Sequence, residues 1–149
     1  MTRRLLLLLL VLPAGLGLAD PPPSAHPARD NAAWRRECGG CHVLYPPAML
    51  PAASWRRLME GLERHFGSDA GLAEPERREI ARWLAANAGP GGGGAPLRIT
   101  ETAAFRHEHD EIAAAVWKRP AVGSRANCQA CHRHAERGRF DETALRIPR

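Results

Sequence analysis

The stretch Cys38-Gly39-Gly40-Cys41-His42 decides how this chain is interpreted, and its pattern returns as Cys128-Gln129-Ala130-Cys131-His132. Each copy has two thiols separated by two residues, with an imidazole directly after the second thiol. This spacing is typical of covalent c-type haem attachment, in which both sulfurs form thioethers and the histidine binds the iron. The sequence therefore predicts two covalently attached haem c groups. They are held by Cys38, Cys41, Cys128 and Cys131, with His42 and His132 as the proximal iron ligands.

Other arrangements use the same four cysteines. Two Cys-x-x-Cys units can hold a tetrahedral zinc ion, but a zinc site needs no histidine after each pair. A thioredoxin-like redox pair requires a βαβ pattern, which the sequence lacks. Disulfides also consume an even number of cysteines in an oxidising compartment. Two complete copies of the five-residue pattern favour haem attachment over all three.

Residues 1–19 are predicted to be a secretory signal peptide. Arg3 and Arg4 precede the apolar run Leu5–Leu12, and Gly17-Leu18-Ala19 supplies small residues for cleavage. The apolar run is shorter than the roughly 20 residues that a membrane-spanning helix needs. We therefore expect cleavage after Ala19 and export to the periplasm, with an uncleaved anchor as the alternative.

The formal charge of +5 at pH 7 does not indicate a nucleic-acid partner. Loss of Arg3 and Arg4 with the leader lowers this charge from +5 to +3. The propionates of two haems add about four negative charges and bring the protein close to neutrality. The remaining arginines are scattered along the chain and form no basic stripe. Membrane contact is expected only through partner proteins.

A Gly- and Pro-rich segment at residues 89–96 divides the chain into parts with one haem motif each. It is predicted to be a flexible linker between an N-terminal haem c domain, 20–88, and a C-terminal haem c domain, 97–149. The alternative is a long surface loop inside one domain. Parts of about 60 residues have marginal cores, so each haem is expected to form most of its half's core. The expected fold is mostly α, the second half being irregular.

The first half is expected to contain helices at 31–37, 54–66 and 75–88, with Asp30, Ser54 and Pro75 at their starts. The helix ended by Gly67 places Trp55, Leu58, Leu62 and His65 on one face. This helix order resembles that of class I cytochrome c domains.

The imidazole of His65 on the buried face predicts a sixth iron ligand opposite His42. The alternative role for His65 is a hydrogen-bonded core histidine. Met49 and Met59 are rival ligands, since a His/Met site also occurs in cytochromes c and has a higher potential. Met59 fits ordinary core packing, and His26 lies in a Pro-rich terminus that favours no ligand role.

In the second half a helix is expected from Thr100 or Thr102 to Lys118, ended by Pro120. Its apolar stripe contains His109, whereas His107 falls among charged residues off the stripe. This periodicity predicts His109 as the sixth ligand of the second haem. His134 follows the proximal His132 too closely to reach the distal side. The stripe consists of Phe105, His109, Ile112 and Val116.

Six phrases outside the haem motifs carry a family resemblance. They are Glu37 with the first motif, Tyr45-Pro46-Pro47, His65-Phe66-Gly67, the run 97–102, the run 120–128 and Arg146-Ile147-Pro148. Together they resemble the bacterial dihaem cytochrome c family that is found with a small oxygen-binding cytochrome. The resemblance implies bis-His ligation, by His42 with His65 and by His132 with His109. It also implies electron donation to that small oxygen-binding cytochrome, with a membrane cytochrome b as a possible source of electrons.

Two irons that are closed by histidine on both sides leave no position for a substrate. The sequence therefore predicts an electron-transfer protein of low potential and not an enzyme. One alternative is a dihaem peroxidase-like enzyme, which would need a five-coordinate haem with catalytic groups around it. Another is a dihaem electron-transfer subunit of a periplasmic reductase, which would also have bis-His haems.

Overall fold

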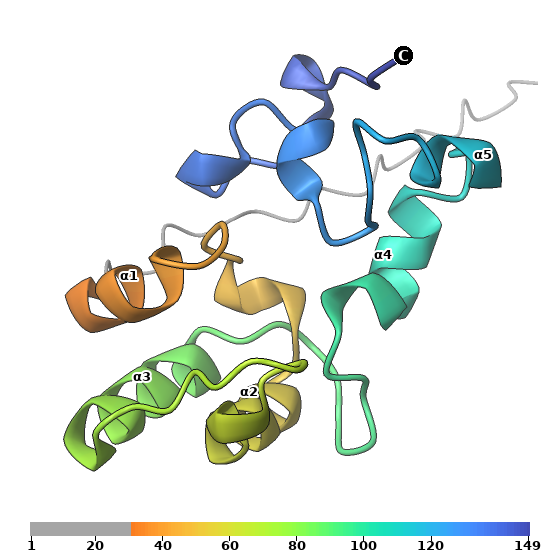
Figure 1. Ribbon diagram of the computed structural model, residues 1–149. Coiled ribbons are helices and arrows are strands. Elements are labelled where there is room, and N and C mark those ends of the chain that lie inside the picture. The colour runs from red at the N-terminus through yellow and green to blue at the C-terminus, as the bar shows by residue number, and fades with distance from the viewer. Residues whose placement is uncertain (1–30) are drawn as a thin grey trace, which may run out of the picture.

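The computed structural model describes residues 31–149, and helices are the regular elements of this part of the chain (Figure 1). Five α-helices alternate with short 3-10 turns, and in residues 31–149 no strand occurs. The mostly α fold class is thereby confirmed. Residues 1–19, His26 and Asp30 lie outside the described residues. The α-helices are α1 (Ala32–Gly39), α2 (Ala52–Glu60), α3 (Glu74–Ala86), α4 (Ala103–Glu108) and α5 (Ala114–Trp117).

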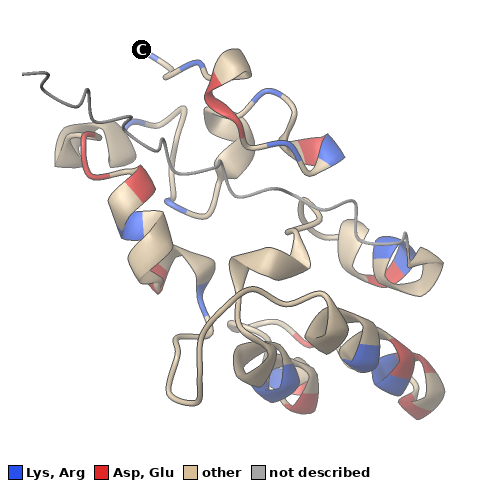
Figure 2. Ribbon diagram, turned by 180° about the vertical axis from the view of Figure 1, so that it is seen from behind, with Lys and Arg blue, Asp and Glu red and all other residues tan. Residues whose placement is uncertain are grey.

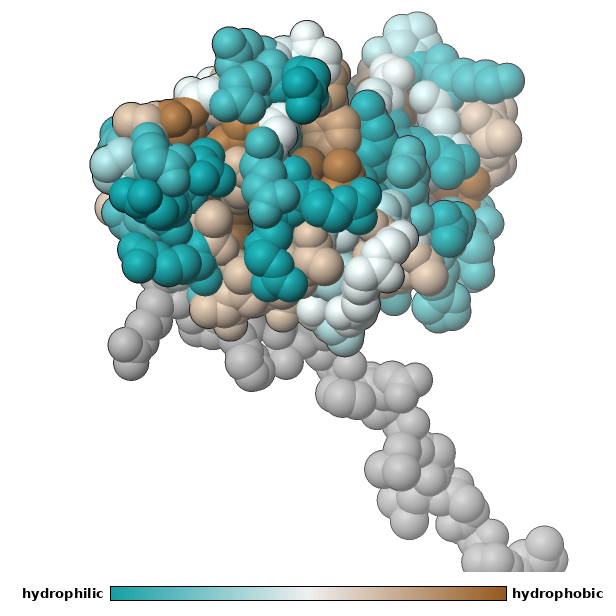
Figure 3. Space-filling view, turned by 90° about the horizontal axis from the view of Figure 1, so that it is seen from below, coloured by the Kyte–Doolittle hydropathy of each residue, from teal (hydrophilic) through white to brown (hydrophobic). Residues whose placement is uncertain are grey.

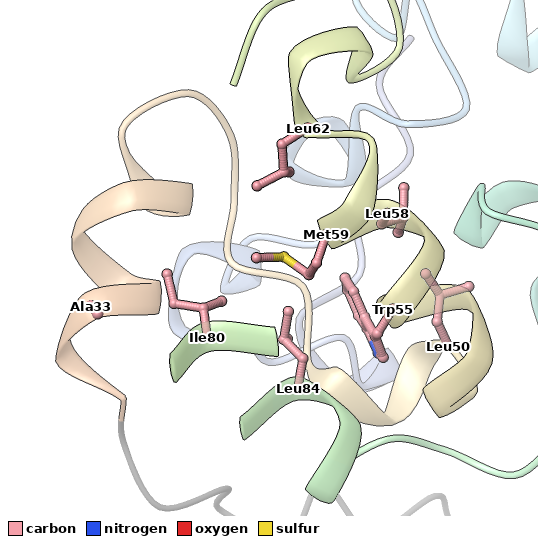
Figure 4. Packing of buried hydrophobic residues seen from close by; sticks show 8 residues of the cluster. All are labelled: Ala33, Leu50, Trp55, Leu58, Met59, Leu62, Ile80 and Leu84. Carbon is pink, nitrogen blue, oxygen red and sulfur yellow. The ribbon is translucent and has the colours of Figure 1, made fainter. Parts of the chain in front are cut away.

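Helices α1, α2 and α3 lie together in both ribbon views, whereas α4, α5 and the C-terminal segment lie on the other side (Figures 1 and 2). The first group encloses one apolar cluster (Figure 4). Ile80 and Leu84 of α3, which are four residues apart and so share one face of the helix, are fully buried there. The cluster consists of Ala33, Leu50, Trp55, Leu58, Met59, Leu62, Ile80 and Leu84.

The second half has almost no apolar core of its own. Among the described residues beyond 96, the only buried apolar side chains are Val122 and Ala135. Its two α-helices are short, and four 3-10 turns make up the rest of its regular structure. Leu145 and Ile147 are large apolar side chains that stay 42% and 40% exposed. A group with a large apolar surface is therefore needed to complete this half.

The prediction of a helix at 54–66 is wrong at both ends, because α2 runs from Ala52 to Glu60. The carbonyl of Pro51 accepts the first helical bond, from Trp55 N, so α2 starts before Ser54. Ser54 is fully buried, and its hydroxyl donates to the carbonyl of Pro96 at 2.9 Å. The helix stops at Gly61, because glycine stabilises a helix poorly. A 3-10 turn, Leu62–Arg64, then carries the chain to His65.

The expected helix from Thr100 or Thr102 to Lys118 is also wrong, because it breaks into α4 and α5. Thr102 is the N-cap, and its side-chain oxygen accepts from Phe105 N at 3.0 Å. The helix ends at His109, whose Nδ1 bonds the Phe105 carbonyl at 2.8 Å. That carbonyl would accept the backbone N–H of His109 in a continuing helix, so the side chain competes with the backbone.

The other two helices differ from expectation only at their ends. Helix α1 runs from Ala32 to Gly39, and Asn31 caps it by accepting from Trp34 N at 2.7 Å. Helix α3 starts at Glu74, so Pro75 is its second residue and not its first. It ends at Ala86, two residues before the expected end. Proline is accommodated here because the first helical N–H groups have no intrahelical partner.

Both ends of the segment 89–96 are bonded to the first half. Gly89 N donates to the Leu50 carbonyl at 3.0 Å. At the other end the Ala95 carbonyl accepts from Arg57 Nη1 at 3.0 Å. The structure therefore describes this segment as a loop anchored on the first half, with Gly93 away from other atoms. The division into two domains stays a prediction.

The surface carries both signs of charge, interspersed along the helices (Figure 2). The face seen from below is largely hydrophilic, with apolar residues in small patches (Figure 3). Within residues 31–149 no helix is both long enough and apolar enough to cross a membrane. The mixed charges agree with the expectation that the arginines form no single basic stripe.

Gly89→Ala should destabilise the first half. A Cβ at residue 89 would lie 2.0 Å from the Ala48 carbonyl oxygen, a backbone atom that cannot move aside cheaply. We expect a loss of about 2 kcal/mol in the free energy of unfolding, as for other overpacked sites. Urea unfolding of the haem-loaded protein measures it.

Gly93→Ala is the matched control, because no atom lies within 4 Å of a Cβ built there. It should change the free energy of unfolding by less than about 0.5 kcal/mol. Equal unfolding midpoints for the two variants would contradict the close approach of residue 89 to Ala48.

Candidate haem sites

The first candidate site brings together His42 and His65. Their ring centroids lie 6.2 Å apart, with an interplanar angle of 26°. His42 follows the end of α1, and His65 follows the 3-10 turn after α2. Behind His65 the chain reverses through Phe66 and Gly67, whose φ angles are 52° and 103°. Ser68 N closes this turn by donating to the His65 carbonyl at 3.0 Å.

The second candidate site brings together His109 and His132. Their ring centroids lie 6.1 Å apart, with an interplanar angle of 71°. His109 ends α4, and His132 follows the 3-10 turn Cys128–Ala130. The backbone N–H of His132 donates to the Cys128 carbonyl at 2.8 Å, which holds the second attachment motif in a tight turn.

Both separations fit a haem iron between two imidazoles. An imidazole nitrogen binds a first-row metal at about 2.0 Å, so two rings on opposite sides of one ion have centroids about 6.3 Å apart. Unrelated ring pairs in direct stacking lie closer, as Phe105 and His109 do at 4.1 Å. The residues present therefore fit a metal ion that is held from two sides.

The ring nitrogens of one histidine in each pair are already oriented by the backbone. His42 Nδ1 bonds the Val43 carbonyl at 2.7 Å, and His109 Nδ1 bonds the Phe105 carbonyl at 2.8 Å. A carbonyl only accepts, so Nδ1 carries the proton in both rings. This leaves Nε2 as the atom with a free lone pair, which is the usual arrangement of a metal-binding histidine.

The other member of each pair is the more deeply placed histidine. His65 Nδ1 and His132 Nδ1 are buried and have no hydrogen-bond partner among residues 31–149. Burial lowers the pKa of His65, and His42 and Arg98 lower it further. Burial and then His109 lower the pKa of His132, against a smaller opposite effect of Asp141. A lowered pKa favours the neutral imidazole, the form that binds a metal.

The four cysteines of the two motifs lie in partly buried surroundings, apart from the exposed Cys41. Burial is the main cause that raises the pKa of Cys38, to about 11, and burial also raises the pKa of Cys128 and Cys131. No disulfide joins them. Within residues 31–149 no group of three or more His, Cys, Asp or Glu side chains converges to hold a metal ion. The donor geometry therefore supports neither a tetrahedral zinc site nor a disulfide.

Aromatic rings surround the second pair more closely than the sequence indicated. Phe105 stacks on His109 at 4.1 Å and 16°, and Trp117 of α5 lies 5.8 Å from the same ring. The ring of Phe140, in the C-terminal segment, lies 5.7 Å from that of His132. The role of Trp117 was missed, because this residue lies outside the expected stripe and reaches His109 only through the break between α4 and α5.

A cation over an aromatic ring supports the turn behind His65. The Arg98 guanidinium lies 4.2 Å from the Phe66 ring centroid, and that ring lies 4.8 Å from the His65 ring. Phe66 has a positive φ, which costs a residue with a Cβ about 1–2 kcal/mol. The contact with Arg98 offsets part of this cost. Sequence periodicity carried no signal for it, since the two residues belong to separate segments.

The rival ligands occupy other places. Met59 is 3% exposed, and its side chain points into the apolar cluster (Figure 4). Met49 ends the 3-10 helix Pro47–Met49 and is half-buried, while the ring opposite His42 belongs to His65. His107 is exposed, and His134 Nδ1 lies 3.9 Å from Glu136. Helix α4 therefore brings His109, and not His107, close to His132.

Two haem attachment motifs with a histidine pair at each define a dihaem c-type cytochrome as the class of this protein. The chain belongs to the dihaem cytochrome c family, whose model matches residues 34–140. No curated protein matches the chain in sequence.

Solved structures of dihaem cytochromes c have similar folds. One from Shewanella baltica is 41% identical, covers 79% of this chain and 93% of its own, and has a TM-score of 0.71. One from Rhodobacter sphaeroides is 45% identical, with 74% and 96% covered and a TM-score of 0.66. A second structure from that organism is 42% identical, with 75% and 98% covered and a TM-score of 0.66. Membership implies two covalently bound haem c groups, whereas the individual ligands stay predictions.

The two sites should differ in electron paramagnetic resonance. The angle between two axial imidazole planes sets the splitting of the ferric iron orbitals, and it is 26° at the first site and 71° at the second. We expect two low-spin ferric signals, with the larger maximum g value from the second haem. His109→Ala should remove that signal and leave the other. Two identical signals in the wild type would contradict the difference in angle.

Phe105→Leu should loosen the second pair. An aromatic contact contributes about 0.5–1.5 kcal/mol beyond buried area, so its loss should raise the open fraction of the second haem about two- to twelvefold. The high-spin fraction in the absorption spectrum of the oxidised protein reports this open fraction.

His107→Ala is the control for this prediction, because His107 lies two residues from His109 with an exposed side chain. Its high-spin fraction should equal that of the wild type. A larger effect of His107→Ala than of Phe105→Leu would show that the wrong histidine of the helix has been assigned.

Proposed function

We propose that this protein carries electrons through two haems that are each closed by histidine on both sides. His42 and His65 are the proposed ligands of the first iron, and His132 and His109 those of the second. The observation that carries the proposal is the separation of the ring centroids, 6.2 Å and 6.1 Å, which suits one metal ion within each pair. Bound haem supplies a reversible one-electron couple, with a low potential for two imidazole ligands.

The surrounding residues favour electron transfer over catalysis. A peroxidase-like enzyme needs one iron with a free position, whereas this arrangement gives every proximal histidine a partner. Aromatic side chains rather than acid and base groups pack beside His109. A subunit of a larger periplasmic reductase has the same ligands, and stable co-purification with such an enzyme would distinguish that role.

The proposed partner is a small oxygen-binding cytochrome, with a membrane cytochrome b as the source of electrons. Support comes from the family resemblance, which covers nearly the whole mature chain apart from the Pro-rich start and the Gly-rich linker. The mixed surface charge fits a small, transient interface, as carriers that must bind and leave quickly require. Location in the periplasm rests on the predicted leader at residues 1–19 and on the export of cytochromes c of this family.

His65→Ala and His109→Ala test the assigned ligands. The reduced wild type should be low-spin and should not bind carbon monoxide, and its oxidised form should lack a methionine-to-iron band. Each variant should open one haem, so that carbon monoxide binds one equivalent per protein. Absorption spectra of the purified proteins measure this.

Met49→Leu is the matched control for the first haem. It should leave the spectrum and the carbon monoxide response unchanged, because His65 rather than Met49 is assigned to the iron. Carbon monoxide binding by the wild type would instead mean that one haem is open or labile. The protein would then be an enzyme or a gas-binding protein and not an electron carrier. Oxidation of the reduced protein by the small oxygen-binding cytochrome, followed by stopped flow, tests the partner.

A further inference from the structure

Tyr45 lies between the two candidate haem sites. Its ring centroid is 5.0 Å from that of His42, at an interplanar angle of 33°. Its hydroxyl donates to the Ala126 carbonyl at 3.2 Å, across 81 residues of sequence. Ala126 precedes Cys128 of the second attachment motif by two residues. The chain has a single tyrosine, and this side chain contacts the proximal segments of both sites.

The segment that receives the Tyr45 hydroxyl is held firmly by its own hydrogen bonds. The backbone N–H of Ala126 donates to Ser124 Oγ at 3.1 Å, and the backbone N–H of Asn127 donates to the Ser124 carbonyl, also at 3.1 Å. The Asn127 side chain donates to the carbonyl of Val122 at 3.0 Å, and Val122 is 1% exposed. The tyrosine hydroxyl therefore binds a fixed point and not a loose loop.

Haem attachment makes Tyr45 more important to this carbonyl. The Cys128 thiol also points to the Ala126 carbonyl, with a sulfur-to-oxygen distance of 3.7 Å. Thioether formation consumes that S–H, so Cys128 can no longer donate. The Tyr45 hydroxyl is then the remaining side-chain donor for the Ala126 carbonyl.

We propose that Tyr45 is a positioning residue that fixes the two haem sites relative to each other for electron transfer between them. This proposal rests on the proposed function, because it concerns the step between the two sites. In that step one electron leaves a ferrous iron, which becomes ferric, and reduces the other ferric iron to ferrous. Tyr45 is neither oxidised nor deprotonated. It keeps the two proximal segments at a constant separation, on which the transfer rate depends.

Tyr45→Phe tests the hydroxyl alone, since it keeps the ring beside His42 and removes the bond to Ala126. Loss of one neutral hydrogen bond should make local opening of the segment 124–127 about fivefold more frequent. Amide hydrogen exchange of the haem-loaded protein measures this opening. Electron transfer between the haems, followed after flash reduction, should slow in Tyr45→Phe. It should slow further in Tyr45→Leu, which also removes the ring.

Thr143→Val is the matched control, because it removes a hydroxyl whose bond, to Asp141, stays within the second half. It should leave both the exchange rates at 124–127 and the transfer rate at wild-type values. Unchanged exchange and unchanged transfer in Tyr45→Phe would overturn the proposal, even if Tyr45→Leu fails to fold. Carbon monoxide binding by the wild type would contradict the proposed function, because one haem would then be open. The amide exchange rates at 124–127 in Tyr45→Phe would still show whether Tyr45 positions the segment.

Discussion

Two pairs of facing imidazole rings constrain the structure more than any helix does. Each pair requires two separate segments to meet, with ring centroids 6.2 Å apart for His42 and His65 and 6.1 Å apart for His109 and His132. The regular elements end where this requirement applies: α2 stops before His65, and α4 stops at His109. Backbone bonds and turns, rather than helical repeat, then set the direction of each ring.

The two halves meet this requirement in opposite order along the chain. In the first half the attachment motif precedes its partner histidine, and in the second half His109 precedes the motif. The halves are therefore not copies of one unit. The hydrogen bond between Tyr45 and Ala126 joins the two attachment segments.

Much of this arrangement could be predicted from the sequence, although two of the expected helices were wrong. The three- and four-residue steps through Leu62 and Phe105 indicated the two histidines that the structure brings beside His42 and His132, although the helices themselves end before His65 and at His109. The break at His109 depends on competition for the Phe105 carbonyl, which periodicity does not report. The contact of Arg98 with Phe66 joins segments with no common pattern.

The apolar core is distributed unevenly between the halves, and this affects how ordered each half is without its haem. The first half encloses a cluster of buried side chains, whereas Val122 and Ala135 are the buried apolar residues described beyond 96. A segment that buries so little cannot offset the entropy of ordering its backbone. Without its haem we therefore expect the second half to be less ordered than the first, which encloses an apolar cluster of its own.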